Sequence, residues 1–162
     1  GYTIGGLVYI SMSWGLLMNL YNYFEGNINE KGWLLPMLII ATIWINDTMA
    51  YVVGSFIGKT PLSVVSPKKT WEGTIAGIIL SVLIVSKGMA MVVPIQEKYI
   101  FYISLIASIA GNFGDLLESK LKRLAGVKDS GSMMPGHGGF LDRFDSILFA
   151  GPFVWILLQF IF

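Results

Sequence analysis

The sequence contains no cysteine and a single histidine, His137. Without cysteine, the chain has no disulfide, no thiolate nucleophile and no zinc site built on sulfur, and its redox compartment stays undetermined. Charged residues are also scarce: they make up 13% of the chain, against 54% apolar residues, and the mean hydropathy is +0.68. These values lie outside the range of soluble domains and predict an integral membrane protein.

Targeting and linker signals are also missing. The first apolar segment has neither a basic n-region nor a small-residue cleavage site, so it is not interpreted as a signal peptide. We find no internal repeat, low-complexity tract or long linker, so residues 1–162 are expected to form one membrane domain. Because the chain begins at Gly1 without methionine, we expect it to be a fragment or to lack its start.

Five apolar segments are long enough to cross a bilayer core of about 30 Å, which takes roughly 20 residues of helix. They are residues 2–24, 33–57, 71–93, 100–117 and 144–162. The third is interrupted by Lys87, whose side chain would have to extend to the membrane interface. The expected fold is an all-α polytopic bundle of about five transmembrane helices with short loops.

The eleven basic residues are divided unevenly between the two sides that these spans define, although the net charge is only +1. One side carries Lys59, Lys68, Lys69, Lys120, Lys122, Arg123, Lys128 and Arg143, and the other carries Lys31, Lys87 and Lys98. By the positive-inside rule the first side faces the cytoplasm. The polar loops on that side are therefore expected to form a cytoplasmic site.

Polar residues recur at helical spacing near the end of the fourth span. Asn112, Asp115 and Ser119 share one face, and Glu118 follows Asp115 by three residues. A carboxylate at membrane depth is costly, and such residues usually face a cavity, pair with a cation or bind an ion. This face is expected to border a polar site.

The fifth span opens with a second acidic pair, Asp142 and Asp145, on either side of Arg143. Together with Asp115 and Glu118, these carboxylates would meet at one end of two adjacent helices. Mg²⁺ prefers oxygen ligands and is often held by one or two carboxylates plus substrate phosphates. The alternative is that Asp142 and Arg143 are helix-start caps and ion-pair partners. The joint pattern favours an ion site.

The loop between these acids, residues 120–139, combines bases with glycines. Its bases are Lys120, Lys122, Arg123 and Lys128, and its glycines are Gly131, Gly136, Gly138 and Gly139. Glycine lets the backbone approach a ligand closely, and successive amides in such turns bind anions. The alternative is that these bases contact only lipid headgroups. The combination favours phosphate binding.

The loop before the third span carries Lys68 and Lys69 beside Thr70, which is placed to cap the following helix, while Glu72 favours its first turn. Two lysines at a helix N-terminus form a plausible phosphate site, and membrane-anchoring lysines at a capped helix are equally compatible. Asn46 and Asp47 lie inside the second span. Asp47 is either a ligand of the polar site or a helix–helix hydrogen-bond partner.

These residues resemble the CDP-diacylglycerol synthases, also called phosphatidate cytidylyltransferases. Residues 119–145 are similar to that family's C-terminal signature, with spacing retained: Ser119, Lys122-Arg123, Lys128-Asp129, Pro135, His137-Gly138-Gly139 and Asp142-Arg143-x-Asp145. Further similarity lies in Gly114-Asp115-Leu116 with Glu118, in residues 66–73, and in Asp47-Thr48, Ala50-Tyr51, Gly54 and Gly58-Lys59. Met134 and Ser55 depart from the pattern, where the family more often has another apolar residue and a base. Such agreement is far more specific than a lone glycine motif.

The resemblance implies transfer of a cytidylyl group from CTP to phosphatidic acid, giving CDP-diacylglycerol and pyrophosphate for phospholipid biosynthesis. It implies a Mg²⁺-dependent enzyme of a bacterial-type inner membrane, with a second cation nearby as an option, and it implies further membrane helices upstream of this C-terminal catalytic part. A homodimer is compatible with it, and no nucleic-acid polymer is expected as a partner. The expected catalytic residues are Asp115, Asp142, Lys128 and Arg143, and the expected metal ligands are Asp115, Asp142, Glu118 and Asp145. The expected substrate-binding residues are Lys59, Ser66, Lys68, Lys69, Ser119, Lys122, Arg123, Asp129, His137, Gly138 and Gly139, with Asn46, Asp47 and Asn112 as further candidates.

Two other functions remain open. A CTP-dependent polyprenol or dolichol kinase would use the same nucleotide and metal, but it would need a base for the acceptor hydroxyl. An ion-coupled transporter would explain Asp47 and Asp115 but not the basic glycine loop.

Overall fold

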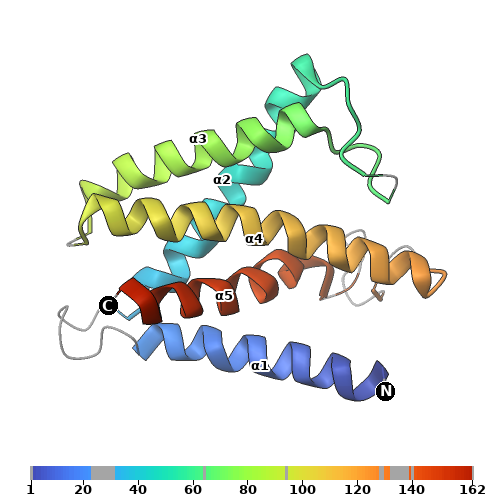
Figure 1. Ribbon diagram of the computed structural model, residues 1–162, viewed down its shortest axis with the longest axis horizontal. Coiled ribbons are helices and arrows are strands. Elements are labelled where there is room, and N and C mark those ends of the chain that lie inside the picture. The colour runs from blue at the N-terminus through green and yellow to red at the C-terminus, as the bar shows by residue number, and fades with distance from the viewer. Residues whose placement is uncertain are drawn as a thin grey trace.

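The computed structural model describes residues 2–22, 32–63, 65–93, 95–127, 130–131, 139 and 141–161. Its elements are α1 (Tyr2–Asn22), α2 (Leu34–Ile57), α3 (Trp71–Ala90), α4 (Glu97–Leu124) and α5 (Leu141–Ile161). Successive helices run in opposite directions, and α1, α5, α4 and α3 form a layered bundle that α2 crosses (Figure 1). The described part contains no strand, only an isolated bridge between Pro61 and Thr70. The all-α prediction is confirmed.

Four of the helices, α2 to α5, are long and apolar enough to cross a membrane. The first predicted span, α1, is not among them in the part of the chain that the structure describes. Length and composition therefore confirm four of the five predicted spans. Helix α4 is also longer than predicted, since its polar end, rich in the good helix formers leucine, lysine and glutamate, continues the helix.

Local signals set the helix ends nearest the polar loops. Thr70 is the N-cap of α3, and its Oγ1 accepts a hydrogen bond of 3.2 Å from the Gly73 amide, as predicted. Helix α4 ends at Leu124, and Gly126 just beyond it has φ 71°. The amides of Gly126 and Val127 donate back to the carbonyls of Arg123 and Lys122. This pair of bonds is the Schellman arrangement, which needs a residue that tolerates positive φ.

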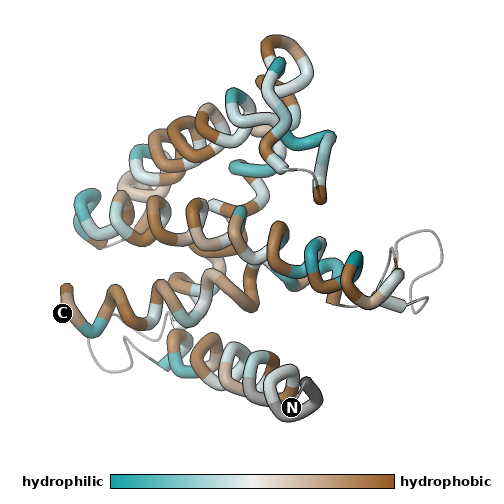
Figure 2. The backbone as a smooth tube through the Cα atoms, turned by 45° about the vertical axis from the view of Figure 1, so that its right-hand side comes forward, coloured by the Kyte–Doolittle hydropathy of each residue, from teal (hydrophilic) through white to brown (hydrophobic). Residues whose placement is uncertain are grey.

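The helices pack through a continuous apolar core, which includes Leu38 and Ile39 of α2, Ile103 of α4 and Leu158 of α5. Apolar residues run along the middle of the helices, and hydrophilic ones collect toward their ends and in the loops (Figure 2). Small residues bring some backbones close together. A Cβ on Gly77 of α3, for example, would lie 2.8 Å from the Asn46 carbonyl oxygen of α2. Close helix approach at small residues is typical of membrane bundles.

The alternating directions of the helices place the end of α2, the start of α3, the end of α4 and the start of α5 at one end of the bundle (Figure 1). The connection formed by residues 58–70 joins α2 to α3 at this end, and residues 125–140 join α4 to α5. The polar segments singled out in the sequence therefore meet here.

Candidate functional site

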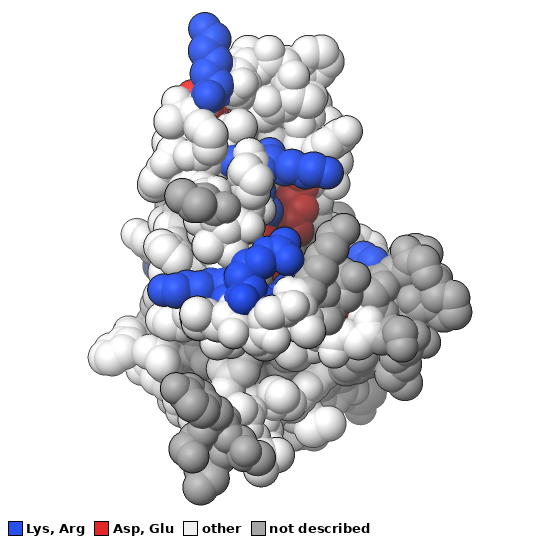
Figure 3. Space-filling model, turned by 90° about the vertical axis from the view of Figure 1, so that its right-hand side faces the viewer, with Lys and Arg blue, Asp and Glu red and all other residues white. Residues whose placement is uncertain are grey.

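A polar cavity of about 690 Å³ opens at this end of the bundle. Its charged and amide residues are Asp47, Lys68, Lys69, Asn112, Asp115, Asp142, Arg143 and Asp145. Viewed from that end, lysine and arginine side chains surround an acidic patch (Figure 3). The structure thus brings together acids and bases from α2, α4, α5 and the loop before α3, as the sequence predicted.

Asp115 of α4 forms an ion pair with Lys69 of the loop between α2 and α3. Both side chains are partly buried, with 25% and 32% of their surface exposed. Asp47 of α2 lies within electrostatic range of both groups. The charge of Lys69 therefore acts on a carboxylate of α2 as well as on Asp115, and the ion pair ties the loop to α4 across the cavity.

Asp142, at the start of α5, has both carboxylate oxygens engaged. Lys122 donates to Oδ1 at 2.6 Å and also to Glu118 Oε2 at 3.0 Å. Oδ2 accepts from the Ser130 amide at 2.9 Å, the Ser130 hydroxyl at 2.8 Å and the Gly139 amide at 2.7 Å. These are the helix-start contacts of the alternative considered for Asp142. Its role as a metal ligand stays a prediction and would require Lys122 to release an oxygen.

Asp145, which lines the cavity, and Glu118, which does not, form a buried acidic pair. Their exposed fractions are 8% and 6%, and the Asp145 carboxyl lies against that of Glu118 and within electrostatic range of Asp115. Glu118 Oε1 is buried and has no hydrogen-bond partner in the described part of the chain. Buried carboxylates this close together require a compensating positive charge or proton.

These carboxylates fit a divalent cation that is only partly held by protein. No group of three or more Asp, Glu or His residues within the described ranges is arranged to bind a metal by itself. Mg²⁺ commonly takes one or two carboxylates and completes its shell with water and substrate phosphates. Asp115 and Asp145 face the cavity, and the unpaired Glu118 oxygen lies behind them, so this donor set suits such a shared site.

Two buried amides connect α2 to α4 beneath the cavity. The Asn112 side-chain amide donates to Asn46 Oδ1 at 3.3 Å and to the Ser108 carbonyl at 2.9 Å. The Asn46 amide in turn donates to Asp47 Oδ1 at 3.3 Å. Asn46 is therefore a helix–helix partner that orients Asp47, while Asp47 itself lines the cavity.

The loop before α3 is held in shape by Glu72. This carboxylate accepts hydrogen bonds of 3.2 Å from the backbone amides of Lys59 and Thr60. The Leu62 amide donates to the Lys69 carbonyl at 2.7 Å, so the loop folds back on itself as a narrow hairpin. The sequence interpretation gave Glu72 only a place in the first helical turn. Its contacts are with residues more than ten positions earlier, and no local pattern shows them.

Several predicted site residues lie off the cavity wall. Lys59, Ser66, Ser119, Lys122 and Arg123 are not among the lining residues. The Ser66 carbonyl accepts a hydrogen bond from the Lys69 amide. The Arg123 side chain donates a hydrogen bond of 3.4 Å to the Val127 carbonyl, beyond the last turn of α4. Direct lining by these residues is therefore not observed, because the helix and loop carry them past the cavity. Lys128, Asp129, His137 and Gly138 lie outside the described residues, and Gly139 enters only through its amide bond to Asp142.

The wall also contains residues that were not selected from the sequence. Trp44 and Tyr51 of α2 line it on either side of Asp47, and Ser146 lines it from α5. The spacing of 44, 47 and 51 puts these α2 residues on one face, a pattern that could have identified them.

Fold and site together define a polytopic helical membrane protein with a charged, phosphate-compatible cavity at one end of its bundle. Residues 3–161 match the model of the Cytidylyltransferase family, and the chain belongs to this family. This confirms the resemblance noted in the sequence.

Similar proteins include the phosphatidate cytidylyltransferase of Bacillus subtilis (strain 168), which is 38% identical over 160 residues, or 98% of this chain and 58% of that protein. A protein of the same name from Synechocystis is 45% identical over 76% of the chain and 43% of its own length. Phosphatidate cytidylyltransferase 4, chloroplastic, of Arabidopsis thaliana is 40% identical over 79% of the chain and 33% of its length. The chain thus spans between a third and three-fifths of these relatives.

Proposed function

We propose that this chain is the catalytic part of an enzyme that transfers a cytidylyl group from CTP to phosphatidic acid. The observation that carries this proposal is one cavity at the end of a membrane bundle, lined both by the bases Lys68, Lys69 and Arg143 and by a set of carboxylates. Two phosphorylated substrates, one water-soluble and one in the lipid, require a charged cavity at the membrane surface. The names of the similar proteins support the same reaction.

The chemistry asks for positioning and charge neutralisation. An oxygen of the lipid phosphate attacks the α-phosphorus of CTP, and the bond from that phosphorus to the pyrophosphate oxygen breaks. The attacking oxygen is already ionised near neutral pH, so no general base is needed. Lys68 and Lys69 approach from the loop and Arg143 from α5, and together they would reduce repulsion between the two phosphate groups.

Magnesium is part of this proposal. Asp115 and Asp145 would hold it at the cavity wall with Glu118 behind them, and when bound it would neutralise phosphate charge and stabilise the departing pyrophosphate. Asp142 would continue to accept the hydrogen bonds of the Ser130 and Gly139 amides, and it would bind the metal only if Lys122 gave up its ion pair with Asp142. Asp47, held by Asn46, would orient Lys69 from the opposite side.

We also propose that the cavity faces the cytoplasm of a bacterial-type inner membrane. Among the described residues, this end carries Lys59, Lys68, Lys69, Lys120, Lys122, Arg123 and Arg143, and the opposite end carries Lys87 and Lys98. That imbalance is the basis of the positive-inside rule.

Incorporation of labelled CTP into chloroform-soluble product tests the proposal, with phosphatidic acid as acceptor and with or without Mg²⁺. The protein is expressed with its natural flanking sequence. Cytidine label should enter lipid only when both phosphatidic acid and Mg²⁺ are present. Transfer of the γ-phosphate alone to a polyprenol would make the protein a kinase, and absence of turnover with intact ion uptake would favour a transporter.

A further inference from the structure

A second, apolar groove of about 420 Å³ lies between α1, α2 and α5. Its lining residues are Trp14, Leu17, Met18, Tyr21, Asn22, Pro36, Ile40, Phe144 and Ile147. The Trp14 and Phe144 rings are in contact, with centroids 5.6 Å apart, and so join α1 to α5 at one part of its wall. The polar groups that this lining offers are the Asn22 amide, the Tyr21 hydroxyl and the Trp14 indole N–H; its other side chains are apolar.

The groove adjoins the polar cavity at one residue. Ile147 of α5 borders both spaces. On α2, Pro36 and Ile40 line the groove, and Ile43 and Asp47 line the cavity. Their spacing of three to four residues places all four on one helical face, so a single stripe of α2 passes from one space into the other.

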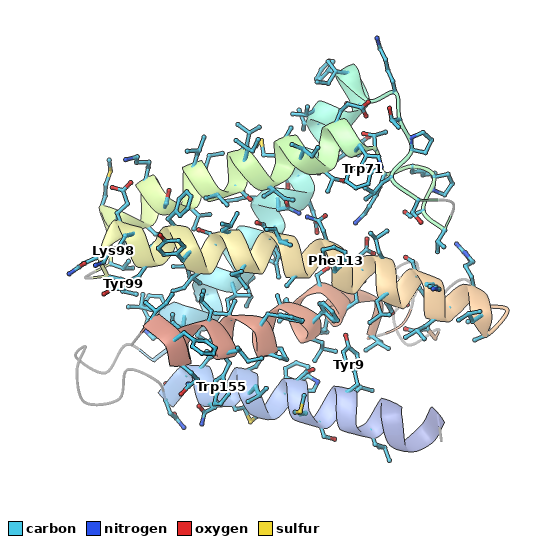
Figure 4. The ribbon with its side chains drawn as sticks, in the orientation of Figure 1. Tyr9, Trp71, Lys98, Tyr99, Phe113 and Trp155 are labelled. Atoms are coloured by element: carbon cyan, nitrogen blue, oxygen red, sulfur yellow. The ribbon has the colours of Figure 1, made fainter. Side chains whose placement is uncertain are left out.

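The groove also runs in a defined direction. Phe144 lies in the first turn of α5, at the charged end of the bundle. Tyr21, near the end of α1, and Pro36, near the start of α2, lie at the other end of the bundle. In Figure 4 the labelled Tyr9 marks the part of α1 nearer the cavity, and Trp155 marks the far part of α5. From Trp14 to Tyr21 the groove follows about two helical turns, roughly 10 Å along the membrane-spanning direction.

We propose that this groove binds an acyl chain of phosphatidic acid whose phosphate lies in the polar cavity. The inference rests on the proposed function and extends it to the lipid half of the substrate. A phospholipid needs a charged pocket and an apolar path that meet at the glycerol, and Ile147 marks such a junction. The chain would then extend from the charged end toward the opposite end of the bundle.

The lining of the groove suits an alkyl chain, because nearly all of its side chains are apolar. An extended chain loses little by moving from the bilayer into an apolar groove. Its selectivity would come from the shape of the groove.

The first test narrows the groove. Ile40→Trp fills it from α2, and Met18→Trp fills it from α1. The matched control is Met37→Trp, because Met37 is 49% exposed on α2 but does not line the groove. KM is measured for dioleoyl and for dihexanoyl phosphatidic acid at saturating CTP. The ratio of the two values should rise about tenfold in the groove variants and stay unchanged in the control. An unchanged ratio in both groove variants would overturn the proposal.

The second test does not depend on turnover. Phosphatidic acid with a diazirine near the end of one acyl chain is cross-linked to the protein with its natural flanking sequence, and the modified peptides are mapped. Label should fall on Met18, Tyr21 or Ile40 and be competed by unlabelled phosphatidic acid. Label confined to other surfaces would show that a protein segment or a second copy occupies the groove, and it would contradict the proposed binding of an acyl chain there. Label in the groove without cytidylyl transfer would reject the proposed reaction and leave the lipid groove standing.

Discussion

Lys69 and Asp115 form an ion pair across the polar cavity, although one lies in the loop before α3 and the other in α4. The pair holds the loop against the helix that carries three of the site's polar residues: Asn112, Asp115 and Glu118. Because Asp47 faces the same lysine, binding of a phosphate by Lys69 would change the balance of charge at both carboxylates. The loop and the acidic helix face are therefore expected to act as one unit.

The first prediction concerns this pair. Asp115→Asn should reduce kcat/KM by roughly 100-fold or more without loss of helix, and Lys69→Met should reduce it strongly as well. The double variant should be little worse than the poorer single one, because groups acting as a unit are not additive. Lys87→Met is the control, since its pair with Glu97 is exposed and at the other end. Near wild-type rates for Asp115→Asn would remove this residue from the site.

Asp142 can be tested for its two proposed roles. Asp142→Asn should abolish turnover with helix content retained, because it loses the ion pair with Lys122 and weakens the bonds to Ser130 and Gly139. If anchoring is its role, Lys122→Met should produce a comparable loss with the same Mg²⁺ dependence. If Asp142 binds the metal, Asp142→Asn alone should shift the Mg²⁺ concentration needed for half-maximal rate. Wild-type activity in Asp142→Asn would contradict both roles.

Glu72 is predicted to be a positioning residue for the lysine loop. Glu72→Ala removes the acceptor for the Lys59 and Thr60 amides, so kcat/KM should fall by about tenfold, mainly through higher KM values. Glu72→Gln keeps one side-chain oxygen and should recover part of the loss. Glu97→Gln, in the first turn of α4 at the opposite end, is the matched control. Equal kinetics for Glu72→Ala and wild type would show that the loop holds its shape without this carboxylate.

Gly77 and Gly88 form a matched pair on α3. A Cβ on Gly77 would lie 2.8 Å from both Ala50 Cβ and the Asn46 carbonyl oxygen, whereas a Cβ on Gly88 meets nothing within 4 Å. Gly77→Ala should therefore destabilise the bundle by about 1–3 kcal/mol through forced separation of α2 and α3. Gly88→Ala should be neutral or stabilising by up to about 1 kcal/mol, because alanine favours helix. Thermal unfolding in detergent compares them, and similar midpoints for both would contradict the packing argument.

Much of the site was accessible from local signals. Asp115 and Glu118 recur at helical spacing, Thr70 has the chemistry of a cap, and Lys68 and Lys69 precede a helix start. Each of these features depends on residues a few positions apart, whose geometry a helix largely sets. Their placement at one end follows from short loops and alternating helix directions. The cavity could therefore be expected, although its exact lining could not.

The chain's composition, apolar segments and spaced polar residues were enough to establish a helical membrane protein, the end of the bundle that carries the site and the family resemblance. Folding alone decided that Lys69 pairs with Asp115, that Asn112 meets Asn46, that Glu72 holds the preceding loop and that an apolar groove adjoins the cavity. These contacts join residues from different elements. They depend on how helices cross and how closely small residues let them approach, and one-dimensional spacing does not contain that information.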